Sequence, residues 1–174
     1  QLLSTTDGLT KISNRAYFDK AVSTELRRAA RQQSPMTIIL FDIDHFKAIN
    51  DTYGHLAGDA CLRGLTNLLR PRIHRAGDIF ARYGGEEFVL AIGGFDLSGS
   101  IALAQEFRAA IEGMQIDFDG VPIRFTASFG VVCAIPNPSL RPQDFLASAD
   151  KALYQAKHDG RNCVRVAALQ KTVL

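Results

Sequence analysis

The chain has 174 residues, enough for one domain with a sizeable core and too few for two. Hydrophobic residues make up 47% and charged residues 22%, the proportions of an ordinary globular protein. The net charge of +2 gives no bulk field for nucleic acid or anionic membranes, so any phosphate chemistry must come from a local cluster.

The cysteine content and the hydropathy narrow the setting in which the chain works. Cys61, Cys133 and Cys163 are far apart and form no CxxC pair, which favours free thiols in a reducing cytoplasm over disulfides or a structural zinc site. No apolar run approaches the roughly 18 residues of a membrane span, and no signal peptide opens the chain. We therefore expect a cytoplasmic segment without direct membrane insertion. Because it begins with Gln1, we expect it to be part of a longer protein.

Helical and strand-like patterns are mixed along the chain. Apolar residues at helical spacing, with Asn14 as a suitable N-cap, predict the first helix. The paired glycines Gly84-Gly85 predict a hairpin, because glycine tolerates the positive φ of tight turns. The expected elements are a helix within Thr10 to Gln33 with Tyr17, Phe18, Val22 and Leu26 on its apolar face, a strand from Met36 to Phe41, a helix from Leu56 to Ile73, strands from Ile79 to Tyr83 and from Phe88 to Ile92, a helix from Ser100 to Met114, strands around Gln115 to Phe118 and Ile123 to Ala134 joined by a turn at Asp119-Gly120, a helix from Arg141 to His158, and a short terminal strand after a turn at Asp159 to Asn162.

This order of elements predicts an α/β fold of the α+β sandwich type. The apolar run Met36 to Phe41 is typical of a strand covered on both faces. A central mixed, largely antiparallel sheet of about five strands, flanked by helices, fits the hairpin better than an all-parallel doubly wound sheet.

Two acids end this buried strand, in the run Phe41-Asp42-Ile43-Asp44. At this spacing Asp42 and Asp44 lie on the same side of a strand. Two crowded carboxylates repel each other unless a cation or a base sits between them, and oxygen ligands suit Mg²⁺. The run indicates a metal site, with a strand-end acid that caps the next helix as the alternative.

A second pair of acids, Glu86 and Glu87, directly follows the glycine turn. Glycine lets the backbone bend tightly and lets a nucleotide approach closely. Adjacent strand residues point opposite ways, so both acids can face one metal only if the turn distorts the pleat. If the hairpin neighbours the strand of Asp42, the acids converge as in two-metal nucleotidyl transfer. An exposed hairpin with a polar tip is the alternative.

Two cations, Lys157 and Arg161, flank the glycine at the end of the last predicted helix. Placed near one edge, they suit the oxygens of a triphosphate. Compensation of the helix dipole by a lysine is the alternative.

These runs together resemble the GGDEF family of diguanylate cyclases, in the GGEEF form Gly84-Gly85-Glu86-Glu87-Phe88. The match spans residues 7 to 162 in family order, and its mild departure is Lys11-Ile12, where the family usually has glycine and leucine. The other matching segments are Asp7-Gly-Leu-Thr10 with Asn14-Arg15, Phe41-Asp-Ile-Asp-His-Phe-Lys47, Ile49-Asn-Asp-Thr-Tyr-Gly-His55 with Gly58-Asp59, Ala149-Asp-Lys-Ala-Leu-Tyr-Gln-Ala-Lys157, and Gly160-Arg-Asn162.

The resemblance implies a palm-like nucleotidyl cyclase fold and a metal-dependent enzyme that condenses two GTP molecules into cyclic di-GMP. It assigns Mg²⁺ or Mn²⁺ to Asp42, the Ile43 carbonyl and Glu86, with Glu87 joining a second metal. Glu86 and Glu87 are the implied catalytic residues. Glu86 would act as general base, with activation by the metal alone as the alternative. The implied substrate-binding residues are Asn50 and Asp59 for guanine, His55 beside them with a packing role as its alternative, Phe46 and Gly84, and Lys47, Lys157 and Arg161 for the phosphates.

The resemblance also implies an organisation around this domain. Residues 1–6 would end a connector helix from an upstream sensory or receiver domain, residues 7–168 would form the catalytic domain, and residues 169–174 a tail. Each domain of the family binds one GTP, so catalysis needs a homodimer. Tethering to the inner membrane through an absent N-terminal region is an alternative to a free cytoplasmic protein.

Arg75-Ala-Gly-Asp78 matches the position of the family's inhibitory site for cyclic di-GMP, where an arginine and an aspartate grip guanine and phosphate. Glu106 stands where some relatives supply a further arginine, with Arg108 close by. Three rival functions stay open: a catalytically silent receptor for GTP or cyclic di-GMP, a dimerising relay module, and a nucleotidyl cyclase with another product.

Overall fold

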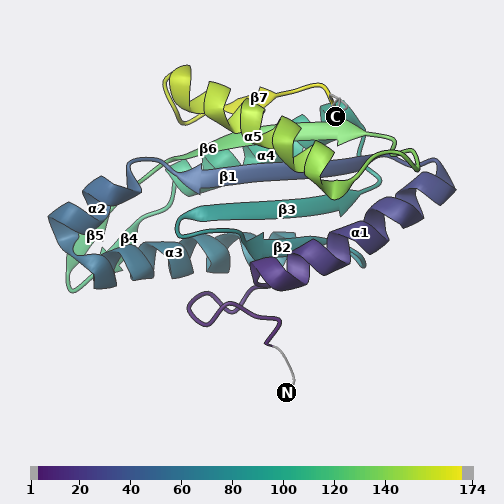
Figure 1. Cartoon of the computed structure of the whole chain (residues 1–174). Helices are drawn as coiled ribbons and strands as arrows, with labels where there is room; N and C mark the ends of the chain where they lie inside the picture. Colours follow the sequence, from purple (N-terminus) through teal and green to yellow (C-terminus); the bar gives the residue numbers. More distant parts are fainter. Residues whose placement is uncertain (1–3, 170–174) are drawn as a thin grey trace.

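A five-stranded sheet forms the centre of the computed structural model, which describes residues 4–169. The strand order is β2-β3-β1-β6-β7 (Figure 1), and only β6 and β7 run parallel to each other. This confirms the predicted mixed, largely antiparallel sheet of an α+β sandwich. The strands are β1 (Met36–Ile43), β2 (Ile79–Arg82), β3 (Glu87–Gly93), β6 (Ala127–Ala134) and β7 (Val164–Val166).

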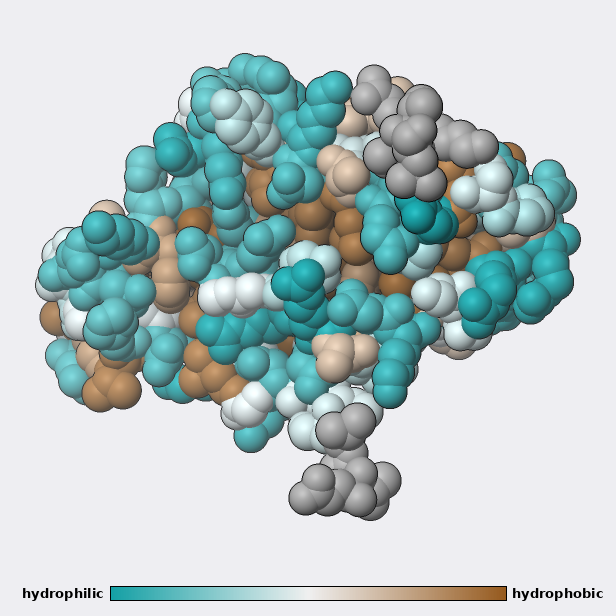
Figure 2. All heavy atoms as spheres, viewed as in Figure 1, coloured by the Kyte–Doolittle hydropathy of each residue, from teal (hydrophilic) through white to brown (hydrophobic). Residues whose placement is uncertain are grey.

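Helices cover both faces of the sheet. The first pair, α1 (Arg15–Gln32) and α5 (Pro142–His158), packs on one face, and α3 (His55–Leu69) and α4 (Leu97–Glu112) pack on the other (Figure 1). Hydrophilic residues dominate the outside of the first face, with apolar residues visible between α1 and α5 (Figure 2). All eight residues of β1 are buried. Because successive side chains of a strand point to opposite faces of the sheet, β1 is covered on both faces, as predicted.

The smaller elements lie at the ends of the sandwich. They are α2 (Phe46–Tyr53), the 3₁₀ turn η1 (Arg70–Arg72), and a separate two-stranded sheet of β4 (Ile116–Phe118) and β5 (Val121–Ile123). The turn between β4 and β5 has positive φ at Asp119 (48°) and Gly120 (79°), which confirms the predicted turn. The sequence patterns did not predict α2, because eight residues give too little helical periodicity.

The predicted N-cap of the first helix is confirmed, because the Asn14 side chain accepts from the Tyr17 N–H and the helix begins at Arg15; Tyr17, expected on the apolar face, is exposed. Two other predicted boundaries were wrong. The next long helix ends at Leu69, since Pro71 lies in the 3₁₀ turn Arg70–Arg72 that follows and disfavours continuation of the α-helix. The strand predicted over residues 123–134 is two strands, β5 and β6, which belong to different sheets.

The remaining expectations concern cysteines, membranes and the chain ends. The three cysteines are free thiols, as predicted. Within residues 4–169 no helix combines the length and apolar character that crossing a membrane requires. Thr6 forms an isolated bridge with Ser13, whereas residues 1–3 of the expected connector and 170–174 of the expected tail lie outside the described residues.

Candidate active site

The predicted acids meet at one end of the β1–β3 pair. Asp42, at the end of β1, lies directly opposite Glu87, at the start of β3. Next to this pair the Ile43 N–H donates to the Glu86 carbonyl at 3.4 Å. The hairpin therefore neighbours the strand of Asp42, which was the condition for the acids to converge.

The turn of this hairpin is held by Arg82. Its guanidinium donates to the carbonyl oxygens of Gly84 (3.2 Å) and Gly85 (2.8 Å), and it also reaches the Asp7 carboxylate at 3.3 Å. The predicted hairpin is confirmed by the antiparallel pairing of β2 and β3, although neither Gly84 nor Gly85 has positive φ. A Cβ built on Gly85 would meet nothing within 4 Å, which leaves open space beside the acids.

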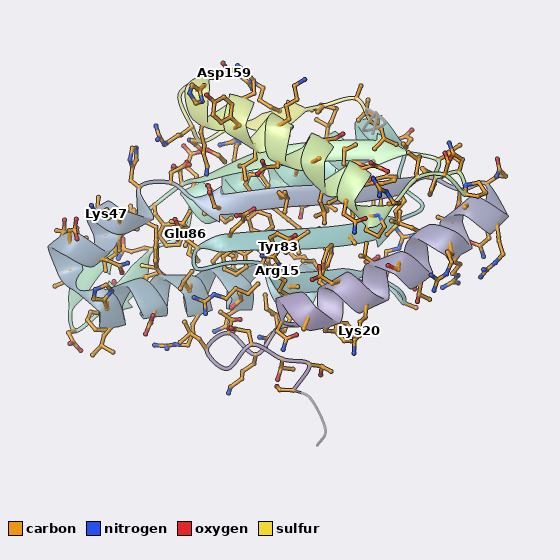
Figure 3. All side chains as sticks on the ribbon, viewed as in Figure 1. Arg15, Lys20, Lys47, Tyr83, Glu86 and Asp159 are labelled. Carbon is orange, nitrogen blue, oxygen red and sulfur yellow. The ribbon has the colours of Figure 1, made fainter. Side chains whose placement is uncertain are left out.

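Residues of α1 also steady the hairpin. The Cζ of Arg15 lies 4.3 Å from the ring centroid of Tyr83 (Figure 3), and the ring of Phe18 meets Tyr83 edge-on at 5.9 Å. Asp7 and Arg15 belong to segments that match the family, and Arg82 to the strand predicted before the glycine turn, but no role was predicted for these three residues. Their pairing was hidden because Asp7 and Arg82 are 75 residues apart.

Asp44 is a structural acid. Its carboxylate accepts hydrogen bonds from Thr126 Oγ1 (2.7 Å), Ser128 Oγ (2.6 Å) and the Asn162 N–H (3.0 Å). These bonds tie the end of β1 to β6 and to the turn after α5. Asp44 therefore holds the end of β1 in place; it is not the N-cap of α2, which is His45, so the alternative of a strand-end acid capping the next helix is not borne out.

A pocket of about 200 Å³ opens between the acids and the end of α5. It brings together most of the predicted metal and phosphate residues, and Lys157 Nζ lies 2.5 Å from Asp42 Oδ2. Lys47 and Glu86 lie at the same end of the sheet (Figure 3). The lining residues are Asp42, Ile43, Asp44, His45, Phe46, Lys47, Glu86, Lys157 and Arg161.

Acidic and basic side chains face each other in this pocket, and the acids shift the pKa of Asp42. Burial raises the pKa of the Asp42 carboxyl; Lys157 opposes this rise, and the nearby Asp44 and Glu86 add to it. Burial also raises the pKa of Glu87, and the charges of Asp42 and Asp150 raise it further. Clustered carboxylates of this kind favour a ligand that brings positive charge.

The donor set fits a magnesium-like ion bound together with phosphate. Among residues 4–169 no three His, Cys, Asp or Glu side chains form a ready metal-binding group. Asp42, Glu86 and the Ile43 carbonyl are oxygen donors at the pocket, and Mg²⁺ commonly takes one or two carboxylates and completes its shell with phosphate and water. Such an ion would share Asp42 with Lys157.

Phe46 connects this pocket to the predicted guanine-reading residues on α2 and α3. A Cβ built on Gly58 would collide with the Asn50 Oδ1 and lie 3.2 Å from the Phe46 ring, so a larger residue at position 58 would displace the Asn50 amide. The buried Asn50 Oδ1 has no hydrogen-bond partner among the described residues. Asp59 is half-buried nearby on α3, whereas His55, the first residue of α3, is exposed.

The turn after α5 presents Arg161 to the pocket in an unusual backbone conformation. Arg161 and Asn162 both have positive φ (63° and 45°), which is uncommon for residues other than glycine. The Asn162 N–H bond to Asp44 helps to hold this conformation. Strained backbone of this kind gathers at functional sites.

Arg75 and Asp78 lie elsewhere, in a pocket of about 250 Å³ at the other end of β1 and β3, beside Met36 and Gly93. Glu106 pairs with Arg72 at 3.4 Å, and Arg108 pairs with Glu112 at 2.6 Å. Residues of α1 complete the lining, which the sequence patterns could not predict because α1 is distant in sequence: Glu25, Arg28, Ala29 and Gln32.

The domain is thus a mixed sheet covered by helices, with acids at the end of its β1–β3 pair faced by a lysine and an arginine, an arrangement compatible with phosphate chemistry. Residues 4–163 match the family described as diguanylate cyclase, GGDEF domain. The chain therefore belongs to the GGDEF family of diguanylate cyclase domains.

Relatives and solved structures agree with this membership. The chain is 39% identical over 162 residues to the diguanylate cyclase DgcP of Pseudomonas aeruginosa, with 93% of this chain and 24% of the relative covered. It is 37% identical over 164 residues to the response regulator PleD of Caulobacter vibrioides, covering 93% and 36%. The chain thus spans well under two thirds of these curated relatives.

Among solved structures, the GGDEF domain of DgcB from Caulobacter crescentus, in complex with c-di-GMP, superposes with a TM-score of 0.87 at 30% identity, covering 95% of this chain and 97% of that one. The diguanylate cyclase SiaD from Pseudomonas aeruginosa, in complex with its activator SiaC, gives a TM-score of 0.88 at 27% identity and covers 94% and 62%. The fold is therefore that of GGDEF domains.

Proposed function

We propose that this domain is an active diguanylate cyclase that condenses two GTP molecules into cyclic di-GMP and two pyrophosphates. The observation that carries the proposal is the pocket in which Asp42 and Glu86 face Lys157 and Arg161. A module that only held a nucleotide would gain nothing from a carboxyl such as Asp42, whose pKa is raised by burial and by the neighbouring acids. None of the metal, guanine or phosphate positions implied by the family is replaced in this chain.

In the proposed reaction, the 3′-hydroxyl of one GTP attacks the α-phosphorus of the other. A new P–O bond forms, the bond to the β-phosphate breaks, and pyrophosphate leaves; the reciprocal step closes the ring. Glu86 would take the hydroxyl proton, and Lys47, Lys157 and Arg161 would neutralise the β- and γ-phosphates. Mg²⁺ or Mn²⁺ held by Asp42, the Ile43 carbonyl and Glu86, with Glu87 at a second metal, would supply further positive charge against the phosphate oxygens.

The orphaned oxygen of Asn50 supports guanine as the base that is bound. A buried acceptor without a partner costs about 1–3 kcal/mol, a cost that a ligand's donor relieves. Guanine offers N–H donors on its Watson–Crick edge to Asn50 and to the Asp59 carboxylate, and adenine offers a different pattern. Buried acceptors would therefore favour GTP over ATP.

One domain supplies only half of this site. Each domain would hold one GTP, so two copies must face each other for the reciprocal attack to occur. An upstream sensory or receiver domain would bring the copies together in the full-length protein. Cyclic di-GMP would also act as an inhibitor in the pocket of Arg75 and Asp78, which is far from the reacting phosphates.

The test is to incubate the purified chain at high concentration with GTP and Mg²⁺ and to identify the products by chromatography. We expect cyclic di-GMP and pyrophosphate, with the rate falling about 10²–10⁴-fold in Glu86→Ala. Glu106→Ala, on the exposed face of α4, is the matched control and should keep the rate. Bound but unconverted GTP, even where copies are forced together, would instead identify a receptor.

A further inference from the structure

The pocket of Arg75 and Asp78 contains a carboxylate that works against an anionic ligand. Glu25 projects from α1 into the lining of this pocket, and only 24% of its side chain is exposed. A charge that is largely withdrawn from water acts on its neighbours more strongly than a freely hydrated one. Glu25 therefore contributes to the field that an incoming ligand meets.

Glu25 lies against the loop that carries Arg75 and Asp78. A Cβ built on Gly77 would lie 3.0 Å from Glu25 Oε2, and Gly77 has a φ of 88°, so only glycine suits this position. The loop is thus pressed against the Glu25 carboxylate. A ligand that enters between α1 and this loop meets Glu25 directly.

Glu25 also forms an ion pair with Arg28, one of the cations that line the pocket. Its Oε2 lies 3.9 Å from Arg28 Nη1, so part of the positive charge of Arg28 is already neutralised. The guanidinium of Arg75 rests over the ring of Phe95, 4.8 Å from its centroid. Arg28 is therefore partly neutralised before any anion binds, whereas stacking on Phe95 leaves the N–H groups of Arg75 able to donate.

The effect of Glu25 extends to Asp78. Burial raises the pKa of Asp78 and Arg75 opposes that rise, while the charge of Glu25 adds to it. Glu25 and Asp78 thus repel each other across the loop. Asp78 lies within the loop that carries Arg75, whereas Glu25 faces this loop from α1.

We propose that Glu25 is an affinity-setting residue of this pocket, whose charge weakens the binding of an anionic guanine dinucleotide. The inference rests on the proposed function, because the ligand considered is the product of that reaction. Glu25 repels the ligand's phosphates and competes with them for Arg28. It sets the product concentration at which inhibition begins, without contacting the reacting atoms.

The test is calorimetric titration of cyclic di-GMP into the unaltered chain and into Glu25→Gln, which keeps the shape and removes the charge. We expect Glu25→Gln to lower the dissociation constant about three- to tenfold, the scale of one partly screened charge at close range. The gain should shrink at high salt. Glu25→Asp, which keeps the charge, should resemble the unaltered chain.

Asp117→Asn is the control for net charge, because Asp117 is an exposed residue of β4 and does not line this pocket. It should leave the dissociation constant unchanged. Equal or weaker binding by Glu25→Gln would overturn the proposal, since the carboxylate would then be neutral toward the ligand or accept a hydrogen bond from it. Failure of both chains to bind cyclic di-GMP would overturn it together with the inhibitory site, whereas failure to convert GTP would strike only the cyclase assignment.

Discussion

At the scale of single residues, the pair Asp42 and Glu87 places like charges opposite each other across two strands. Like charges in this position destabilise an antiparallel pair. Burial and the neighbouring acids raise the pKa of both carboxyls, so the folded chain holds their protons more tightly than the unfolded chain does. The charged forms therefore cost stability, a cost that a bound cation would relieve.

Replacing Glu87 should reveal this cost. A carboxyl whose folded pKa is raised destabilises the fold once the pH exceeds that pKa, and the penalty disappears as the pH falls to the unfolded value. We expect Glu87→Gln to raise the free energy of unfolding by about 0.5–1 kcal/mol at mildly alkaline pH, because solvent still screens this half-buried group. The gain should vanish near pH 4, about the usual pKa of glutamate.

Urea unfolding at a series of pH values measures this difference. Glu106→Gln, which removes a carboxylate from the exposed surface of α4, should show no such pH-dependent gain. A Glu87→Gln chain that is less stable at every pH would contradict the prediction and would show that the carboxylate is held by stabilising contacts.

The role of a residue could be predicted from the sequence only where the residue belongs to a recognisable motif. The neighbouring positions of Asp42 and Glu86 followed from a strand end and a hairpin that meet in one sheet. The bonds of Asp44 did not, because its hydroxyl donors are 82 and 84 residues away in the chain. Which acid is engaged and which is free depends on side-chain contacts that periodicity does not encode.

At the scale of elements, the packing of α5 on β6 depends on Gly130. A Cβ built there would lie 2.9 Å from the Leu153 Cα and would collide with the backbone of Ala149 and Leu153. The close approach brings the end of α5, with Lys157, to the acids at the end of β1. The position of this helix is thus part of the site.

Gly130→Ala should therefore push α5 away from the sheet. Because the obstacle is backbone rather than a flexible side chain, we expect a loss of about 2–4 kcal/mol in the free energy of unfolding. Chemical denaturation measures it. Gly8→Ala, where an added Cβ meets nothing within 4 Å, should change stability little. An unchanged Gly130→Ala chain would show that α5 can move outward without cost.

The elements that were predicted well are those with long, regular patterns. Met36 to Phe41 is a continuous apolar run, and its strand was found with only its last residues missing. The misses have local physical causes: α2 is too short to show a period, and the break between β5 and β6 follows from tertiary pairing in two separate sheets.

At the scale of the whole molecule, the two pockets lie at opposite ends of β1 and β3. The pocket of Asp42 and Glu86 would hold one GTP, and the proposed reaction joins two GTP molecules. Activity should therefore depend on how often two copies meet, while the binding of GTP by one copy should not. Catalysis would thus require two copies of the chain, whereas binding of GTP would require only one.

We expect the rate of cyclic di-GMP formation per chain to rise with protein concentration. Where dimers are the minor species, doubling the protein should raise the rate per chain about twofold, because the dimer fraction follows mass action. Fusing a parallel dimeric coiled coil to the N-terminus should raise the rate and remove the concentration dependence, provided that the fusion lets the acidic pockets face each other. A constant rate per chain, measured where sedimentation shows only monomers, would mean that one copy completes the reaction alone and that the half-site argument fails.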